Sequence, residues 1–271
     1  MWLALDIGNS AAKGGLYDGT TLEHVFHVDH HQPAFRADGA NAAWTRALQP
    51  ALDGVAVERV GVASVVPTVA ANATAALERL TEAPIESIRP TMRLPFTLAY
   101  RTPDTLGVDR LAAAAAAWAA HGADAAPTRP VVAIDAGTAV TLDVITRDGV
   151  YEGGVIGPGP ALLRRALHDG TAQLPTVPLT WPDRVIGRST GEGLQSGIMI
   201  GFVESVRGLL AQVASTLDDA PVVVATGGWR DLLARRIDTI DRIRPHLVLD
   251  GIRVLMELNP PDQPSDRPSP C

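Results

Sequence analysis

The sequence contains one short pattern twice, and this repeat limits the folds that the chain can adopt. Residues 3–10 (LALDIGNS) are echoed by residues 132–139 (VAIDAGTA). In each copy an apolar run ends in Asp-x-Gly, and an Asp-Gly hairpin signal follows, at Asp18-Gly19 and at Asp148-Gly149. Two copies of one hairpin-first unit predict an α/β fold with two similar, duplicated lobes. The alternative is a chance similarity between two short glycine turns.

The apolar patterns and the breakers between them predict the order of the elements. In the first half we expect strands at 2–7, 13–17, 20–29 and 59–65, an extended piece at 84–88, and helices at 40–52, 69–80 and 111–121. In the second half we expect strands at 131–134, 222–225 and 247–249, helices at 161–168 and 191–217, a short helix after 228 and a last helix after 251. The predicted domains are residues 1–122, residues 123–257 and a solvated tail, 258–271.

Composition excludes several classes of protein. The net charge is −7 and the basic residues are scattered, which argues against a nucleic-acid surface. A single cysteine, Cys271, allows neither an intrachain disulfide nor a thiolate zinc cluster. The first residues lack the layout of a secretory signal, and the Ala-rich run 111–120 is too short to span a bilayer. We therefore expect a cytoplasmic protein with no membrane or nucleic-acid partner.

The first Asp-x-Gly turn, residues 6–10, is a candidate anion site. A strand that ends in a tight glycine turn points several backbone N–H groups in one direction. Asp6 repels phosphate, so its expected role is to hold a hydrated divalent ion that bridges phosphate oxygens. Lys13, on the next strand, can neutralise phosphate charge. The alternative is an ordinary hairpin turn in which Asp6 caps backbone groups.

The second turn, residues 135–141 (DAGTAVT), repeats this chemistry. Asp135 can hold a cation, and Thr138 offers a hydroxyl and an N–H group to a phosphate. Two such turns that face each other would hold the phosphates of a nucleotide between the lobes. No G-x-x-x-x-G-K-[ST] pattern occurs, which excludes a P-loop.

The segment 107–110 (GVDR) precedes a run of strong helix formers. In a functional interpretation, Asp109 accepts a proton from a substrate hydroxyl and Arg110 binds a carboxylate or phosphate. In the alternative, Asp109 is only a helix N-cap and Arg110 a surface charge. A helix N-terminus favours the ionised carboxylate, so Asp109 would mainly orient the hydroxyl.

Three other segments leave alternatives open. Residues 153–160 (GGVIGPGP) are too rich in Gly and Pro for regular structure, and either link two elements or let a ligand approach the backbone. Thr226-Gly227-Gly228 either contacts adenine or ribose, or is a plain strand-to-helix turn. Thr190 either caps a helix or faces a ligand. The four histidines between residues 24 and 31 lack metal-site spacing and predict a solvated strand and turn.

The ordered set of motifs resembles the type III pantothenate kinases, the Bvg accessory factor family, over nearly the whole chain. The matching motifs lie at 6–10 (DIGNS), 64–67 (SVVP), Tyr100 with Pro103, 107–110 (GVDR), 135–141 (DAGTAVT), 153–156 (GGVI) with 158–159 (PG), 171–175 (TAQLP), Thr190 with 195–197 (QSG), and 226–228 (TGG). The resemblance implies the actin/hexokinase/Hsp70-like fold, which is ribonuclease H-like and two-lobed. It also implies ATP-dependent phosphorylation of pantothenate to 4'-phosphopantothenate, the first step of coenzyme A biosynthesis.

The resemblance assigns a role to each matching position. It implies ATP binding by Asp6, Ile7, Gly8, Asn9, Ser10, Ala11, Ala12, Lys13 and Thr138. It implies pantothenate binding by Tyr100, Gly107, Val108, Asp109, Arg110 and Thr190, with Asp109 as the catalytic proton acceptor. Asp135 would coordinate a monovalent cation, K⁺ or NH₄⁺, and Mg²⁺ would accompany ATP. The family's site lies near a dimer interface, so a homodimer is implied.

Three positions depart from the family's usual residues, and two other functions stay open. Ser10 stands where Thr is common, Val108 where Ala is usual, and Thr102 where Asn is frequent. None of these changes removes a chemical group that the mechanism needs. The other functions are a kinase or phosphohydrolase of the same fold for another small hydroxy acid, and a non-catalytic ATP-binding regulator.

Overall fold

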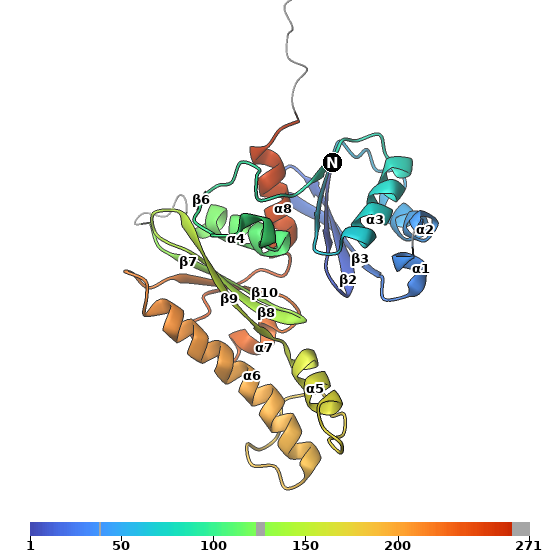
Figure 1. The fold of residues 1–271 in the computed structure, drawn as a ribbon. Helices are drawn as coiled ribbons and strands as arrows, with labels where there is room; N and C mark the ends of the chain where they lie inside the picture. Colours follow the sequence, from blue (N-terminus) through green and yellow to red (C-terminus); the bar gives the residue numbers. More distant parts are fainter. Residues whose placement is uncertain (38, 123–127, 262–271) are drawn as a thin grey trace, which may run out of the picture. The chain divides into compact units, whose positions relative to one another are not determined.

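The computed structural model describes residues 1–37, 39–122 and 128–261, and its contacts divide the chain into two compact units. Among the described residues, the first unit holds those within 1–95, 107–112 and 248–261, and the second holds those within 96–106 and 113–247. Figure 1 shows the elements of both units. The predicted domains divide the chain differently, at residue 122 and with 248–257 in the second domain. The C-terminal helix belongs to the first unit because its side chains pack on the first sheet.

The first unit contains a five-stranded sheet with the order β3-β2-β1-β4-β5. Its strands are β1 (Trp2–Ile7), β2 (Ala11–Asp18), β3 (Thr21–Asp29), β4 (Arg59–Ser64) and β5 (Ile85–Ser87). Strands β1 to β3 form antiparallel hairpins, whereas β4 runs parallel to β1 and β5 parallel to β4. The helices are α1 (Pro33–Arg36), α2 (Asn41–Leu52), α3 (Pro67–Leu80), the start of α4 (Val108–His121) and most of α8 (Leu247–Leu258).

Helices cover both faces of this sheet. Apolar side chains of α2 and α3, among them Trp44, Leu48 and Leu77, join strand residues in one buried core. On α8, Ile252 and Met256 lie so close to Gly61 of β4 that a Cβ there would meet the Met256 sulfur at 2.5 Å. Glycine in β4 therefore lets the helix approach the sheet closely.

The second unit repeats the same arrangement in a six-stranded sheet with the order β11-β10-β7-β8-β9-β6. Its strands are β6 (Thr97–Leu98), β7 (Val131–Ala136), β8 (Ala139–Ile145), β9 (Val150–Pro158), β10 (Val222–Thr226) and β11 (Arg242–Ile243), with helices α5 (Pro160–Asp169), α6 (Thr190–Ala214), α7 (Arg230–Ala234) and a 3₁₀ turn (Pro103–Thr105). Strands β7, β8 and β9 are antiparallel, and β10 and β11 run parallel to β7. Each sheet thus contains two successive hairpins followed in the chain by two parallel strands, which confirms the predicted duplication.

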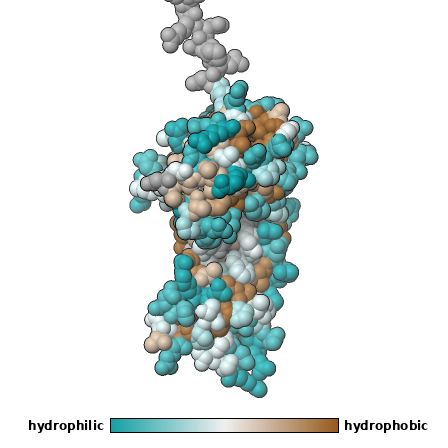
Figure 2. Space-filling model, turned by 90° about the vertical axis from the view of Figure 1, so that its right-hand side faces the viewer, coloured by the Kyte–Doolittle hydropathy of each residue, from teal (hydrophilic) through white to brown (hydrophobic). Residues whose placement is uncertain are grey.

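Helix α6 packs along one face of the second sheet (Figure 1), and its Phe202, Val203 and Val206 are buried against strand residues. By length and composition alone, α6 is long and apolar enough to cross a membrane. That is weak evidence, because a helix packed in a protein core can be equally long and apolar. The surface drawn in Figure 2 is mostly hydrophilic, with apolar side chains in separate patches.

Most predicted elements are confirmed within a few residues, and two predictions are wrong. Residues 150–158 form β9, although the run from 153 onward was expected to be irregular. A Cβ on Gly154 would lie 1.8 Å from the Leu142 carbonyl oxygen on β8, so glycine is what lets this strand pair there. Residues 247–249 begin α8 instead of forming a strand, and the strand lies earlier, at 242–243. Residues 262–271 of the predicted tail lie outside the described residues.

Candidate active site

The first Asp-x-Gly turn connects β1 to β2. β1 ends at Ile7 and β2 begins at Ala11, so residues 8–10 form the connection, which the Gly8 N–H closes by donating to the Ala11 carbonyl at 3.1 Å. Within the described part of the chain, the N–H groups of Asn9 and Ser10 make no backbone hydrogen bond. Two backbone donors at a partly exposed turn are suited to an anion.

Asp6 and Lys13 are cross-strand partners on β1 and β2. Residues directly opposite each other in an antiparallel pair project from the same face of the sheet. An acidic and a basic side chain, both half-buried, therefore lie side by side next to the turn. This arrangement is compatible with a cation and a phosphate bound together.

The second turn connects β7 to β8 and is one residue shorter. β7 ends at Ala136 and β8 begins at Ala139, so residues 137–138 form the connection, and the Gly137 N–H donates to the Ala139 carbonyl at 2.9 Å. Asp135 is half-buried at the end of β7, and Thr138 is exposed at the tip. The motif is thus preserved in both units with different turn lengths.

Two glycines from distant segments pack against this second turn. The Gly159 N–H donates to the Thr138 carbonyl at 3.0 Å. Gly227 has a φ of +86°, and a Cβ there would lie 2.4 Å from an oxygen of Asp135. Both segments had been considered as places of ligand approach. Their α-carbons lie against the backbone or the aspartate of the turn, and no local pattern in the sequence indicates this packing.

The acceptor segment, residues 107–110, starts helix α4. The helix begins at Val108, so Asp109 is its second residue. The alternative interpretation, in which Asp109 is the N-cap of this helix, is therefore wrong. Its Oδ1 accepts the backbone N–H of Arg110 at 2.8 Å, and a Cβ on Gly107 would lie 2.5 Å from the same oxygen. Glycine at 107 therefore leaves the room that this carboxylate occupies. Arg110 is 8 % exposed, so it is not the surface charge of the alternative interpretation.

Tyr100 lines a cavity of about 640 Å³ in the second unit, together with Ala99, Arg101, Thr102 and Glu152. Its ring lies 6.1 Å from that of Tyr151, edge to face. Beneath it, Tyr151 donates its hydroxyl to Asp143 Oδ1 at 2.7 Å, and Asp143 is 1 % exposed. No motif in the sequence points to this buried pair, although an acidic residue inside an otherwise apolar strand, Asp143 in β8, is a signal for it.

Thr190 is the first residue of α6 and is exposed. The N-cap is Ser189, whose side chain accepts the N–H of Glu192 at 3.3 Å. The prediction that Thr190 caps this helix is therefore wrong by one residue, and its hydroxyl is left for another role.

The predicted site residues fall in both units. Asp6 to Lys13 and Gly107 to Arg110 belong to the first, whereas Tyr100, Asp135, Thr138 and Thr190 belong to the second. Among the described residues, no group of three or more His, Cys, Asp or Glu side chains is arranged to hold a metal ion. A cation here would therefore need ligands beyond a protein carboxylate, such as phosphate oxygens or backbone carbonyls.

The four histidines between residues 24 and 31 do not share one environment. His24, His27 and His31 are at least partly exposed, but His30 is completely buried. Burial, with the Lys13 ammonium opposite, lowers the pKa of His27. The prediction of a solvated segment is wrong for His30, whose Nε2 lies 3.0 Å from the Gly8 carbonyl.

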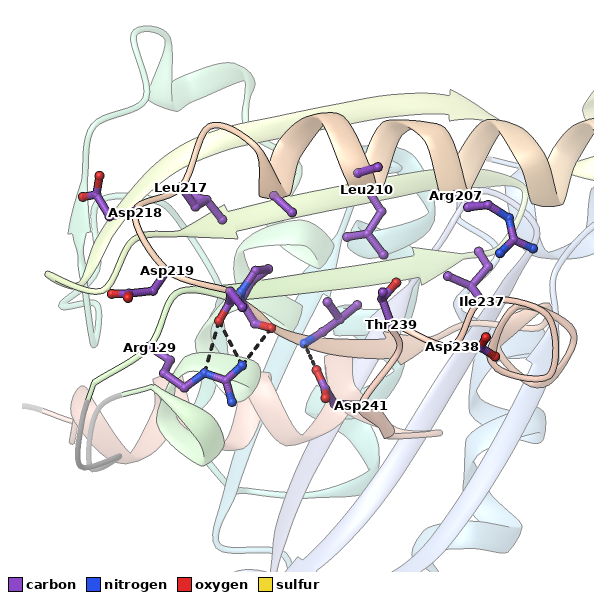
Figure 3. Close-up of a pocket in the computed structure, with 15 residues that line it drawn as sticks. Arg129, Arg207, Leu210, Leu217, Asp218, Asp219, Ile237, Asp238, Thr239 and Asp241 are labelled. Atoms are coloured by element: carbon purple, nitrogen blue, oxygen red, sulfur yellow. Dashed lines mark hydrogen bonds between the residues drawn. The ribbon is translucent and has the colours of Figure 1, made fainter.

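A second cavity, of about 660 Å³, lies in the second unit beside α6 and the start of β10 (Figure 3). Apolar side chains such as Leu210 and Ile237 line it, and Arg129 donates to the Ala220 carbonyl at its edge. Pro221 and Val223 place it where β10 begins. Ligands of open α/β sheets bind outside the carboxyl ends of strands, where both Asp-x-Gly turns lie. We therefore assign no part of the active site to this cavity.

Solved structures show the same fold. A structure from Campylobacter jejuni, described as a Baf family transcriptional activator, matches with a TM-score of 0.58 at 20 % identity, over 95 % of this chain and 98 % of that one. A structure from Sinorhizobium meliloti, described as a 2-dehydro-3-deoxygalactonokinase, matches with a TM-score of 0.57 at 13 % identity, over 97 % and 100 %. The duplicated units and their paired turns define an actin/hexokinase/Hsp70-like kinase fold, as predicted.

Sequence comparison then narrows the class to a family. The family model for type III pantothenate kinase matches residues 2–212. The chain is also 37 % identical over 265 residues to the type III pantothenate kinase of Chlorobaculum parvum, covering 95 % of this chain and 94 % of that relative. The chain belongs to the type III pantothenate kinase family. This confirms the predicted family and its activity, the ATP-dependent phosphorylation of pantothenate in coenzyme A biosynthesis, with ATP and a divalent metal.

Proposed function

We propose that Asp109 accepts the proton as this chain phosphorylates pantothenate. The 4'-hydroxyl oxygen forms a bond to the γ-phosphorus of ATP, the bond from that phosphorus to the β–γ bridging oxygen breaks, and ADP leaves. The proton of the hydroxyl passes to the Asp109 carboxylate. The observation that carries this proposal is the position of that carboxylate at the start of a helix. It accepts a hydrogen bond from the Arg110 N–H, and the absence of a side chain at Gly107 leaves space for it.

The first turn is proposed to bind the phosphates of ATP. Its free backbone donors, Asn9 and Ser10, and the Lys13 ammonium supply the positive potential. The proposed ATP ligands are Asp6, Ile7, Gly8, Asn9, Ser10, Ala11, Ala12 and Lys13, with Thr138 from the second turn. The exposure of Thr138 supports its part in this set.

Pantothenate is proposed to bind at Tyr100, Gly107, Val108, Asp109, Arg110 and Thr190. The cavity beside Tyr100 supports this assignment in the second unit. In the first unit, the guanidinium of Arg110 provides a planar pair of donors of the kind that a carboxylate binds. The carboxylate of pantothenate is the matching group.

Two cations are proposed to assist. Mg²⁺ commonly binds through one carboxylate and substrate phosphates, so Asp6 beside the first turn fits it without a protein cage. When bound, it neutralises charge on the phosphates. A monovalent cation, K⁺ or NH₄⁺, is assigned to Asp135, whose carboxylate is backed by Gly227 and lies near the backbone carbonyls of the second turn.

A cytoplasmic homodimer is the proposed assembly. Ile156, Val185 and Ile186 of the second unit are 62 %, 70 % and 82 % exposed. Large apolar side chains at that exposure favour a covered surface. Light scattering on the purified chain tests this proposal: Ile186→Asp should shift a dimer toward monomer, and a monomeric parent chain would exclude it.

The central test is Asp109→Asn, assayed by ADP release with ATP, magnesium, potassium and pantothenate. We expect a loss of about 10²- to 10⁴-fold in kcat, typical of a positioned acid–base group, with the Kd for ATP unchanged. Asp104→Asn is the matched control, because Asp104 is exposed in the neighbouring 3₁₀ turn and should keep full activity. Near-normal turnover of Asp109→Asn would exclude the assignment.

The same assay with a panel of small hydroxy acids separates the remaining functions. A higher kcat/KM for another acid would replace pantothenate as the substrate. ATP binding without any phosphoryl transfer would identify a non-catalytic regulator.

A further inference from the structure

His30 is a buried polar residue that the proposed mechanism does not use. It follows β3 and is 0 % exposed. The Gly8 carbonyl can only accept a hydrogen bond, so the ring nitrogen Nε2, 3.0 Å away, is the donor. Nδ1 is buried without a partner in the described part of the chain. Leaving a buried polar atom unpaired costs about 1–3 kcal/mol, so core packing alone does not favour histidine here.

Arg36, in the short helix α1, holds the next carbonyl of the same turn. Its Nη2 donates to the Asn9 carbonyl at 2.5 Å, and its Nε donates to the His30 carbonyl at 3.1 Å. Two successive carbonyls of the first turn, those of Gly8 and Asn9, therefore each accept from a side chain that follows β3.

Fixing these carbonyls also fixes two N–H groups. A peptide unit is planar and trans, so the C=O of one residue and the N–H of the next point in opposite directions. The Gly8 carbonyl thus sets the direction of the Asn9 N–H, and the Asn9 carbonyl sets that of the Ser10 N–H. These are the two N–H groups of the turn that make no backbone hydrogen bond among the described residues. His30 and Arg36 aim them away from the protein groups that hold the carbonyls.

The core of the first unit holds the segment that carries His30 and Arg36 in place. Trp44 of α2 packs against His30, with ring centroids 5.9 Å apart, and donates its indole N–H to the Phe35 carbonyl at 3.2 Å. Asn72 of α3, 7 % exposed, donates to the Ala37 carbonyl at 2.9 Å. The segment that carries His30 and Arg36 is therefore bonded to two core helices, α2 and α3.

We propose that His30 and Arg36 are positioning residues for ATP, holding the Gly8 and Asn9 carbonyls so that the Asn9 and Ser10 N–H groups face its phosphates. The inference rests on the proposed function of the first turn. It predicts that removing either side chain weakens the binding of ATP and changes the binding of pantothenate little.

The test compares three variants of the full chain by calorimetric titration with a non-hydrolysable ATP analogue and by steady-state kinetics. His30→Leu keeps the apolar volume and removes the donor, so we expect the Kd for the analogue and the KM for ATP to rise about tenfold, the equivalent of about one hydrogen bond. The KM for pantothenate should stay within about twofold. His30→Gln should recover most of the affinity, because its amide nitrogen can replace Nε2. Arg36→Gln, at an exposed position, should weaken the analogue similarly without disturbing the core.

Tyr17→Phe is the matched control, because it also removes a hydrogen bond of a buried ring, that of the Tyr17 hydroxyl to Asp250 at 2.8 Å, at the far end of β2. It should leave both KM values unchanged. If His30→Leu does not fold, Arg36→Gln decides the matter alone. Parent-like analogue binding in the folded variants would overturn the inference and leave the proposed function standing. A parent chain that binds the analogue but does not phosphorylate pantothenate would overturn only the proposed function, and one that binds no analogue would overturn both.

Discussion

Gly107→Ala separates the position of the proposed proton acceptor from its chemistry. The new Cβ would lie 2.5 Å from Asp109 Oδ1, whereas ordinary contact begins at 3.4 Å, so the carboxylate must move by about 0.9 Å. A misplacement of about 1 Å at a reacting group costs on the order of 10²-fold in rate. We therefore expect kcat to fall about 10²-fold while the carboxylate itself is retained.

The stability of this variant should change little. Gly107 is not among the glycines with positive φ, so alanine fits its backbone conformation. Alanine lowers the entropy of the unfolded chain, which stabilises by about 0.4–1 kcal/mol, and weakening the hydrogen bond to the Arg110 N–H costs about 0.5–1.5 kcal/mol. The two effects nearly cancel, so a loss of rate would not reflect a loss of folded protein.

The assay is kcat from coupled ADP release, together with the free energy of unfolding in urea. Gly208→Ala in α6 is the control, because nothing lies within 4 Å of its added Cβ, and it should keep its activity. Combining Gly107→Ala with Asp109→Asn should add little to the loss from Asp109→Asn alone, since both act through one carboxylate. A Gly107→Ala enzyme within threefold of the parent's kcat would refute the argument that the place of Asp109 matters.

Three further outcomes follow from other contacts. Burial and the guanidinium groups of Arg244 and Arg242 lower the pKa of His121 below its ordinary 6.5. As pH falls, the unfolded chain therefore takes up a proton at this residue before the folded chain does. The free energy of unfolding should decline as pH falls below 6.5, and it should decline less in His121→Gln. Gly227→Ala should displace Asp135 and force an unfavourable φ, which lowers both the unfolding free energy and the activation by potassium, measured by denaturation and by a potassium titration. Arg59→Met leaves Glu86 half-buried and unpaired, so urea denaturation should show a loss of about 3 kcal/mol, smaller when Glu86→Gln is also present.

Local signals in the sequence were sufficient for the hairpins and for the acceptor helix. The Asp-x-Gly turns lie where the two copies of the repeat place them, and their flanking strands pair as apolar runs next to a tight turn should. Gly107 to Arg110 precedes a run of alanines, and α4 starts there. Each of these features depends on residues within about ten positions of one another.

Features that depend on distant partners were not predictable. Gly154 suits a strand only because the Leu142 carbonyl lies against it, and no local pattern names that neighbour. By its sequence His30 is one of several polar histidines, and only the structure shows it buried, with Trp44 of α2 packed against its ring. Helix α8 follows most of the second unit in the chain but covers the first sheet, because Gly61 of β4 leaves space for its side chains. A repeat predicts the units, but not which later segment completes each one.

The two turns are held in different ways, and this difference suggests which of them tolerates change. In the first unit, side chains fix the carbonyls of Gly8 and Asn9 across hydrogen bonds. In the second, the α-carbon of Gly159 lies directly against the carbonyls of Gly137 and Thr138, where a Cβ would lie 2.3 and 2.6 Å from their oxygens. Side-chain donors can be weakened in steps, as from His30 to Gln to Leu, whereas a backbone contact with no space for a Cβ permits glycine alone. Graded changes in ATP affinity should therefore come from the first turn, and substitutions behind the second should act as all-or-none losses.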